Sequence, residues 1–419
     1  MRGWYYRLKA HLGLSVATDI LLLNTAVLDL RSRDFAFAER LVGKGGLARC
    51  RTMDMPPYTQ EQLRGWIEAG GATAGGPGNS APLMARAGLK VAVGVNLGRG
   101  NYGGLDIQGR TFYDILAAHG VDLSEAVVHP NLPTGTTFIH ESPNAERGGI
   151  AYFPNANNDF NFDHFKGSVE RLKPRVVHYM YSGLSDRGDA NGGRDLADFM
   201  RWCRSKGCIT VADSHTLAAR PQPLIEGGDR VDGYRLLEPL LLELDIFFTS
   251  SDESKLIVNT LDRPHRWSGD VQADATTALD FLVEAFGPAR GGTRLAGVTD
   301  ARGAFEKHVQ PDGGSSAARR VDSRFLSGEV VDLVGAGDSF RAGVLSTVAR
   351  HAHAFQTGKL DVAKAVQMGN LFASLFIKAP LDSRYGGIAP LAVMEQVVQD
   401  GKSYGTMDEL REALKAAAA

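Results

Sequence analysis

Near the C-terminal end, a glycine-rich turn opens a helix on an acid, with the sequence Asp332-Leu333-Val334-Gly335-Ala336-Gly337-Asp338. Such a turn leaves backbone N–H groups without intrahelical partners, and together with the helix dipole they form a site for an anion such as a phosphate. A carboxylate in that cradle is poor for binding alone, so Asp338 suggests a base beside a transferred phosphoryl group. Asp338 could equally be one of the acids favoured in any first helical turn.

A second candidate is Asp29, which follows an apolar run that is predicted to be a strand. In doubly wound sheets, ligand groups come from the carboxyl ends of strands. A carboxylate there can accept hydrogen bonds from paired hydroxyls of a polyol. Ordinary turn chemistry is the alternative for an acid after a strand.

A third candidate is the segment Ala74-Gly75-Gly76-Pro77-Gly78-Asn79-Ser80-Ala81, which runs into an amphipathic helix. Its glycines allow the backbone to approach a ligand closely, and Asn79 offers both a donor and an acceptor. The segment could instead be a flexible loop in which Asn79 or Ser80 caps the helix.

The fourth candidate is the acidic segment Ser250-Ser251-Asp252-Glu253, which follows a predicted strand and opens a helix. Its acids could organise water molecules around Mg²⁺, an ion that prefers carboxylates and water. A capping box would use the same residue types at the same spacing.

The composition is that of an ordinary soluble globular protein, with 419 residues, 43% hydrophobic and 22% charged, and a formal net charge of −2. Nothing in it points to nucleic acid or to a membrane as a partner. The three cysteines are too few for a disulfide framework and lack zinc spacing, and the N-terminus has no apolar signal core, so we expect a cytoplasmic protein. Neither a P-loop motif nor an early Gly-x-Gly-x-x-Gly is present.

The elements that must position these residues are short apolar runs alternating with amphipathic stretches, which is typical of a sheet covered by helices on both faces. Because the runs are apolar throughout, we expect a mostly parallel sheet. The predicted strands are Ile20–Leu28, Val91–Val95, Val176–Met180, Ile209–Asp213, Asp245–Phe248 and Leu295–Thr299. The predicted helices are Ser80–Ala87, Arg110–His119, Arg194–Ser205, Leu236–Leu244, Thr276–Phe286, Phe340–His351 and Val362–Ile377.

Two segments break this rhythm. Gly135–His140 and Gly149–Tyr152 alternate at the period of a strand around the polar stretch 141–146, which predicts a projecting β-hairpin that Arg31–Asp54 could join. Such strands could cover a cleft and exclude water, or they could form a surface hairpin without a gating role. Their open edges could also pair across a two-fold axis to make a homodimer.

In combination and in this order, these segments resemble the PfkB (ribokinase-like) family of carbohydrate kinases, over roughly Asp19 to Pro390. The strongest element, Asp332-x-x-Gly335-Ala336-Gly337-Asp338, is similar to the second signature of the family. Gly75-x-x-x-Asn79-x-Ala81 followed by Gly104-x-Asp106-x-x-Gly109 is similar to the first. The resemblance implies a three-layer α/β/α domain at 19–400, with a mostly parallel central sheet and a small lid of β-strands within 30–58 and 133–154. Residues 1–18 would be an extension and residues 401–419 a C-terminal helix or tail.

The resemblance also implies roles for the phosphate turn. Asp338 would take the proton from the substrate hydroxyl as it attacks the γ-phosphate of ATP, and the amides of Gly335, Ala336 and Gly337 would form the anion hole. In many relatives the turn that begins at Asp332 also helps to hold a monovalent cation, so K⁺ is a further candidate beside the cofactors ATP and Mg²⁺.

The remaining assignments concern substrate, metal and nucleotide. Asp29, Gly75 and Asn79 match positions that contact the sugar. Glu253 matches a glutamate that tunes magnesium, through water, and phosphate. Thr299 and Gly303 match a stretch that lines the nucleotide, and Asn370 falls where a late helix approaches adenine.

The chain departs from the family pattern at positions outside the base and the anion hole. Leu333 stands where Thr is usual and Ser250 where Asn is expected, and Ala74 replaces the first of two paired glycines. Ala301 occupies a usual glycine position, and Asp213-Ser214-His215 replaces the common Asp-Pro-Asn. These changes bear on the handling of magnesium, nucleotide and monovalent cation.

We therefore expect an ATP-dependent kinase that phosphorylates a primary alcohol of a small sugar or sugar derivative. One alternative is a nucleoside kinase of the same fold, which would stack a base on aromatic residues such as Tyr152, Phe153 and Phe160. Another is a non-catalytic sugar- or nucleotide-binding protein, which the changes at Leu333 and Ser250 would suit.

Overall fold

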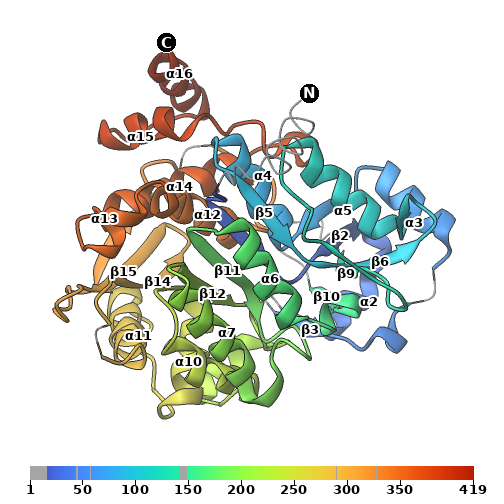
Figure 1. Ribbon diagram of the computed structural model, residues 1–419, viewed down its shortest axis with the longest axis horizontal. Coiled ribbons are helices and arrows are strands. Elements are labelled where there is room, and N and C mark those ends of the chain that lie inside the picture. The colour runs from blue at the N-terminus through green and yellow to red at the C-terminus, as the bar shows by residue number, and fades with distance from the viewer. Residues whose placement is uncertain (1–16, 44–45, 57, 141–148, 289, 327) are drawn as a thin grey trace.

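The computed structural model describes residues 17–43, 46–56, 58–140, 149–288, 290–326 and 328–419. At its centre is an eight-stranded sheet in the order β16-β15-β14-β13-β12-β11-β1-β5 (Figure 1). From β5 to β14 neighbouring strands pair in parallel, whereas β15 and β16 add an antiparallel edge. The strands are β1 (Ile20–Leu23), β5 (Val91–Gly94), β11 (Val176–Ser182), β12 (Ile209–Ser214), β13 (Ile246–Ser250), β14 (Arg294–Asp300), β15 (Gly303–Val309) and β16 (Arg319–Asp322).

Successive strand residues alternate between two apolar layers, one on each face of this sheet. In β1, Ile20 and Leu22 belong to one layer, and Leu21 and Leu23 to the other. The first layer includes α4 (Pro77–Arg86), α12 (Ala336–Arg350) and α14 (Val362–Ile377). The second includes α6 (Phe162–Leu172), α7 (Arg194–Ser205), α9 (Leu237–Leu241), α10 (Ser251–Leu261) and α11 (Val271–Ala285). The predicted three-layer α/β/α fold with a mostly parallel sheet is therefore confirmed (Figure 1).

A second sheet has the order β3-β10-β9-β2-β4. Its strands are β2 (Val27–Ser32), β3 (Leu47–Arg49), β4 (Ala72–Gly75), β9 (Gly135–His140) and β10 (Ile150–Phe153). The two predicted hairpin strands pair antiparallel as β9 and β10, and residues of the 31–54 segment do join them. Strand β4 was not predicted from the sequence, and the stretch 141–146 lies outside the described residues.

The other described elements extend the apolar layers, cover the far face of the second sheet and connect the sheets. A small three-stranded sheet contains β6 (Asn96–Gly100), β7 (Gly104–Leu105) and β8 (Val127–His129). The remaining α-helices are α2 (Ala36–Leu41), α3 (Gln60–Glu68), α5 (Ile107–Ala118), α8 (Pro221–Gly227), α13 (Ala352–Gln356), α15 (Leu391–Gln399) and α16 (Met407–Ala418). In α16, Leu410 and Leu414 are buried in the first apolar layer, so the C-terminal helix packs onto the main body. Across the described residues, no helix has both the length and the apolar character that a membrane crossing requires.

The predicted strand Ile20–Leu28 is in fact two strands that belong to different sheets. Asn24 and Thr25 separate them, with φ angles of 73° and 56° in the left-handed region. Both side chains donate to the carbonyl of Met180, at 3.2 and 3.4 Å, which supports this unfavourable backbone. Asp29 therefore lies within β2 and does not follow a strand, because the apolar run continues across the change of sheet.

The sequence predicted the positions of these helices more accurately than it predicted their ends. Helices α7 and α14 have the predicted bounds, whereas α12 begins at Ala336 and not at Phe340. Gly335 adopts a φ of 87° immediately before α12, so the helix can begin one residue after the turn. Asp338 therefore lies in the first turn of α12.

A buried arginine holds two helix ends together, which gives a test of the fold. The Arg294 side chain, in a residue only 1% exposed, donates to the main-chain carbonyls of Leu241, Leu242, Leu244 and Phe286. Several of these carbonyls end α9 and α11 and have no partner inside their helices.

We predict that Arg294→Met lowers the free energy of unfolding by about 3 kcal/mol, because it leaves buried carbonyls without a donor at nearly constant side-chain volume. Urea denaturation measures the change. Arg411→Met, at an exposed pair on α16, is the control and should change the same quantity by about 0.5 kcal/mol or less. Equal losses in the two variants would contradict the role given to Arg294.

Candidate active site

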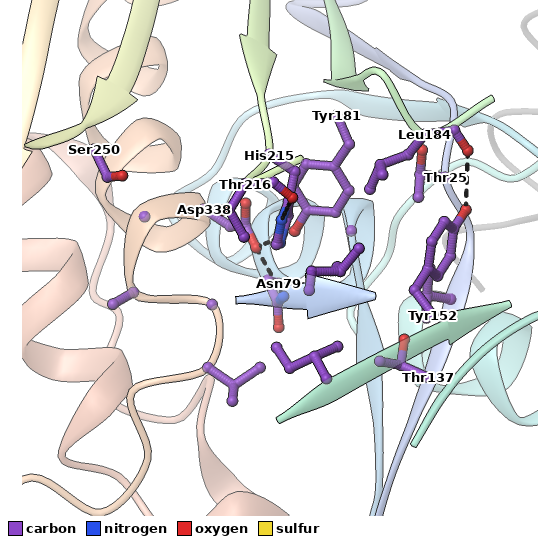
Figure 2. Close-up of a pocket in the computed structure, with 18 of the residues that line it drawn as sticks. Thr25, Asn79, Thr137, Tyr152, Tyr181, Leu184, His215, Thr216, Ser250 and Asp338 are labelled. Atoms are coloured by element: carbon purple, nitrogen blue, oxygen red, sulfur yellow. Dashed lines mark hydrogen bonds between the residues drawn. The ribbon is translucent and has the colours of Figure 1, made fainter. Parts of the chain in front are cut away.

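A cavity of about 320 Å³ lies where the carboxyl ends of the main-sheet strands meet the second sheet (Figure 2). Parallel strands bring their carboxyl ends to one edge of a sheet, so residues far apart in the sequence gather there. The residues that line the cavity at or just beyond these strand ends are Thr25, Tyr181, Ser214, His215, Thr216, Ser250 and Thr299.

One face of the second sheet forms the opposite wall of the cavity. Its lining residues are Val27 and Asp29 of β2, Leu47 of β3, Thr137 and Ile139 of β9, and Ile150 and Tyr152 of β10. The alternate residues, such as Leu28, Leu30 and Phe138, point into a separate apolar cluster on the far face. The period of two thus explains why Asp29 faces the cavity, beside its register partner Thr137.

The glycine turn and the first turn of α12 form the third side. Gly335, Ala336, Gly337 and Asp338 all line the cavity, and Asp338 is only 4% exposed. A Cβ atom at Gly335 would lie 2.7 Å from the side chain of Asn79, so only glycine lets this turn meet the start of α4. The positive end of the α12 dipole is thereby directed at the cavity, as binding of an anion requires.

Three donors from different elements hold the carboxylate of Asp338. Asn79 Nδ2 donates to its Oδ2 atom at 2.9 Å, and Tyr181 Oη donates to the same oxygen at 2.5 Å. Arg341 Nη2 donates to Oδ1 at 2.6 Å. Figure 2 shows Asp338 between Asn79 and Tyr181. The predicted base and the predicted substrate residue Asn79 are therefore in direct contact.

A buried charge network lies behind this carboxylate. Arg341 Nε lies 2.7 Å from Asp213 Oδ2, and Asp213 Oδ1 accepts from the backbone N–H of Tyr181 at 2.6 Å. Burial acts to raise the pKa of Asp213, but Arg341 and the nearby His178 hold that pKa below its ordinary value. Burial acts to lower the pKa of Arg341, yet Asp213 and Asp338 raise it. Arg341 therefore stays charged between two acids.

Asp29 is buried, and a Cβ atom at Gly75 would lie 2.5 Å from its Oδ2 atom, so the glycine makes room for the carboxylate. Burial raises the pKa of Asp29 to about 6, against the opposing influence of Arg31 and of a hydrogen bond with Thr137. Gly75 itself does not line the cavity, whereas its neighbour Gly76 does.

Glu253 forms the capping box that the sequence left as an alternative. Its Oε2 atom accepts from the N–H of Ser250 at 3.1 Å and from Thr249 Oγ1 at 3.0 Å, and Ser250 Oγ accepts from the N–H of Glu253. Glu253 and Asp252 also line the cavity. In the part of the chain that the structure describes, no group of three or more His, Cys, Asp or Glu side chains could hold a metal. The carboxylates present instead suit a Mg²⁺ ion bound through water and phosphate oxygens.

The three residues predicted to line the nucleotide do not lie together in the structure. Thr299 lines the cavity, with its Oγ1 atom donating to the carbonyl of Thr249 at 3.3 Å. Gly303 and Asn370 lie outside the cavity lining. Gly303 pairs with Asp322, and Asn370 donates to the carbonyl of Val321 at 3.4 Å, so both lie beside β16.

Several residues at this site were not predicted from the sequence. Tyr181 has a φ of 62° at the end of β11, and only its place at a strand end could have indicated it. Arg341 was detectable, because residues three apart on a helix are neighbours and Asp338 is such a partner. His215 lines the cavity edge-on to Tyr181, and His178 is buried near Asp213.

The sequence suggested three aromatic residues that could stack on a base, and one of them, Tyr152, lines the cavity. Phe153 and Phe160 are buried in separate apolar clusters, away from the cavity lining.

Comparison with known proteins identifies the family of this chain. The family model described as pfkB family carbohydrate kinase matches residues 53–224 and 315–384, which is more than half of the chain. The chain belongs to the PfkB family. It is therefore a kinase by family, and PfkB kinases use ATP. No curated protein matches the chain in sequence.

Solved structures of PfkB-type kinases share the fold at low identity. A fructokinase with bound ATP from Xylella fastidiosa is 19% identical with a TM-score of 0.60, covering 92% of this chain and 99% of that one. An adenosine kinase from Anopheles gambiae is 14% identical with a TM-score of 0.60, covering 90% and 99%. A probable sugar kinase from Rhizobium etli CFN 42 is 17% identical with a TM-score of 0.59, covering 92% and 98%. Both sugar and nucleoside kinases are thus among the similar structures.

The charge network gives a prediction about stability and pH. Arg341→Met leaves Asp213 and Asp338 buried without their cation, so we expect a loss of about 3–5 kcal/mol in the free energy of unfolding at pH 8. Without the guanidinium, burial raises the folded-state pKa of Asp213 above its unfolded value. The folded state then binds more protons than the unfolded state, and the loss shrinks as the pH falls toward 5. Urea denaturation at both pH values measures it.

Arg110→Met is the control, because Arg110 pairs with Asp114 on the exposed surface of α5. Its loss should be about 0.5 kcal/mol or less at either pH. A pH-independent loss in Arg341→Met would show that packing, and not charge, explains the effect.

Proposed function

We propose that this PfkB-family kinase is an ATP-dependent phosphotransferase that phosphorylates a primary alcohol of a small sugar or sugar derivative, with Asp338 as the general base. The observation that carries the proposal is the position of Asp338. Its carboxylate lies in the cavity at the N-terminus of α12, between a phosphate-type glycine turn and Asn79. A base for phosphoryl transfer must be near both the hydroxyl and the phosphate.

In the proposed reaction, the oxygen of the substrate hydroxyl bonds to the γ-phosphorus of ATP and the bond to the bridging β–γ oxygen breaks, so that ADP leaves. The hydroxyl proton passes to Asp338. The Gly335–Gly337 amides and the α12 dipole stabilise the charge that develops on the transferred group.

Mg²⁺ would be held near Glu253 through water, with Asp252 beside it, and when bound it would neutralise charge on the phosphates. Glu253 is also fixed by its capping box, so its carboxylate is oriented in the protein itself.

The substrate wall combines polar and apolar groups. Asp29, Thr137 and Asn79 can form hydrogen bonds with hydroxyls. The side chains of Val27, Ile139 and Ile150 offer apolar surface to the C–H face of a sugar ring.

A nucleoside is the second candidate. It is favoured by an apolar stretch beside Tyr152 that could accept a base, made of Leu47, Ile139, Ile150 and Leu184. ADP release measured across hexoses, pentoses, sugar acids and nucleosides separates the two. A non-catalytic binding protein would bind one of them without releasing ADP.

We predict that Asp338→Asn lowers kcat by about 10²–10⁴-fold, because the amide cannot take the hydroxyl proton. Binding of ATP, measured by calorimetry, should persist because the turn and the helix dipole remain. Asp280→Asn, at a surface pair on α11, is the control and should keep wild-type turnover. Turnover near wild type in Asp338→Asn would reject the assigned base.

The raised pKa of Asp29 predicts a pH dependence of substrate use. An ionised carboxylate accepts hydrogen bonds from two hydroxyls, so kcat/KM for the alcohol substrate should rise as the pH passes about 6. At pH 5 it should be about tenfold below its plateau, since about a tenth of Asp29 is then ionised. Steady-state kinetics from pH 5 to 8 test this.

Asp29→Asn should lower the plateau of kcat/KM and remove the limb near pH 6. Asp189 provides a matched control, because burial also raises its pKa to about 6 but it does not line the cavity. Asp189→Asn should keep the limb. Persistence of the limb in Asp29→Asn would exclude Asp29 as its source.

A further inference from the structure

Behind the glycine turn, two buried arginines converge on Asp332. Arg31 Nη2 lies 2.9 Å from Asp332 Oδ2, and Arg384 Nη2 lies 3.5 Å from the same oxygen. The side chains of Arg31 and Arg384 are 5% and 2% exposed. They come from opposite ends of the chain, β2 and the segment after α14, so the fold assembles this cluster around the residue predicted to help hold a monovalent cation.

Arg384 does more than pair with the carboxylate. Its Nη2 atom also donates to the carbonyl of Val334 at 2.9 Å, one residue before Gly335. Its guanidinium lies 3.9 Å from the ring centroid of Phe376, and its Nε and Nη1 atoms have no hydrogen-bond partner among the described residues. One guanidinium thus bridges the carboxylate and a main-chain carbonyl of the phosphate turn.

Arg31 is held in place from the other side. Its Nη1 atom donates to Thr73 Oγ1 of β4 at 2.7 Å. Asp332 Oδ1 accepts from the N–H of Val334 at 2.9 Å, so both carboxylate oxygens have partners.

These contacts do not fit a monovalent cation at Asp332. The carboxylate oxygens and the Val334 carbonyl are already engaged, because guanidinium groups contact Oδ2 and the carbonyl, and the N–H of Val334 donates to Oδ1. Leu333 offers no side-chain oxygen. A cation bound at this carboxylate would lie beside two guanidinium groups of like charge, and that repulsion disfavours it.

We propose that the Arg384 guanidinium takes the place of a monovalent cation beneath the phosphate turn, so that nucleotide binding and turnover are independent of K⁺. The fixed charge braces the backbone that leads into Gly335 and adds a positive potential behind the anion hole. This inference rests on the proposed function, because it gives the Gly335–Gly337 turn the role of binding phosphate.

The first test compares the wild-type protein in KCl and in choline chloride of equal ionic strength. Calorimetric titration with the non-hydrolysable analogue β,γ-methylene-ATP and MgCl₂ should give dissociation constants within about twofold of each other, and the melting temperature without nucleotide should be the same. Tighter binding in KCl by about tenfold or more, equal to about 1.4 kcal/mol, would overturn the proposal.

The second test removes the arginine. In Arg384→Ala, a cation can enter the vacated position, so K⁺ should raise the melting temperature by about 2 °C relative to choline. K⁺ should also restore part of the lost affinity for the analogue. A variant whose melting temperature is the same in both salts would overturn the proposal.

Two further variants serve as controls for charge and for the loss of an arginine elsewhere. Arg384→Lys retains the charge, so it should fold and bind the analogue without K⁺ even if Arg384→Ala is unstable, and a K⁺ requirement in it would count against the proposal. Arg86→Ala, which removes an exposed arginine bonded to the carbonyl of Gly386, should show no cation effect.

The melting-temperature comparison needs no nucleotide. Failure of the wild type to bind nucleotide in both salts would therefore reject the proposed function separately.

Discussion

The site depends on one buried guanidinium placed between two acids. Arg341 pairs with Asp338, which faces the cavity, and with Asp213, which lies beneath it. Without that charge, two carboxylates would be buried without a cation, which is strongly destabilising. The same ion pair therefore allows both acids to be buried and holds the cavity carboxylate in place for its proposed role as a base.

The rest of the fold places hydrogen-bond partners around Asp338 and Asp213. The parallel strands supply Tyr181 and Asp213 at neighbouring strand ends, and two helix N-termini supply Asn79 and Asp338. The second sheet closes the opposite side with residues of a single face. Each wall follows from an elementary rule, since parallel strands end together, helix N-termini attract anions and strand side chains alternate.

Local rules explain what the sequence could predict. Apolar runs indicated the main sheet, and the glycine turn with Asp338 identified the α12 N-terminus, because both signals lie within a few consecutive residues. The division of Ile20–Leu28 between two sheets could not be predicted, since it depends on hydrogen bonds to Met180, far along the chain. The arginine cluster at Asp332 was missed for the same reason, because Arg31 lies 301 residues from Asp332 in the sequence. Arg341 was within reach, three residues from Asp338.

The short connection at Asn24 and Thr25 also has a mechanical consequence. It joins β1, which lies next to the edge strand β5 of the main sheet, directly to β2, and both residues are bonded to one carbonyl of β11. Because the connection is this short, the start of β2 is held at the cavity rim. Asp29 lies four residues beyond Thr25, so at about 3.3 Å per residue it can be no more than roughly 13 Å from the joint. The position of this cavity carboxylate is therefore tied to the main sheet through the backbone itself.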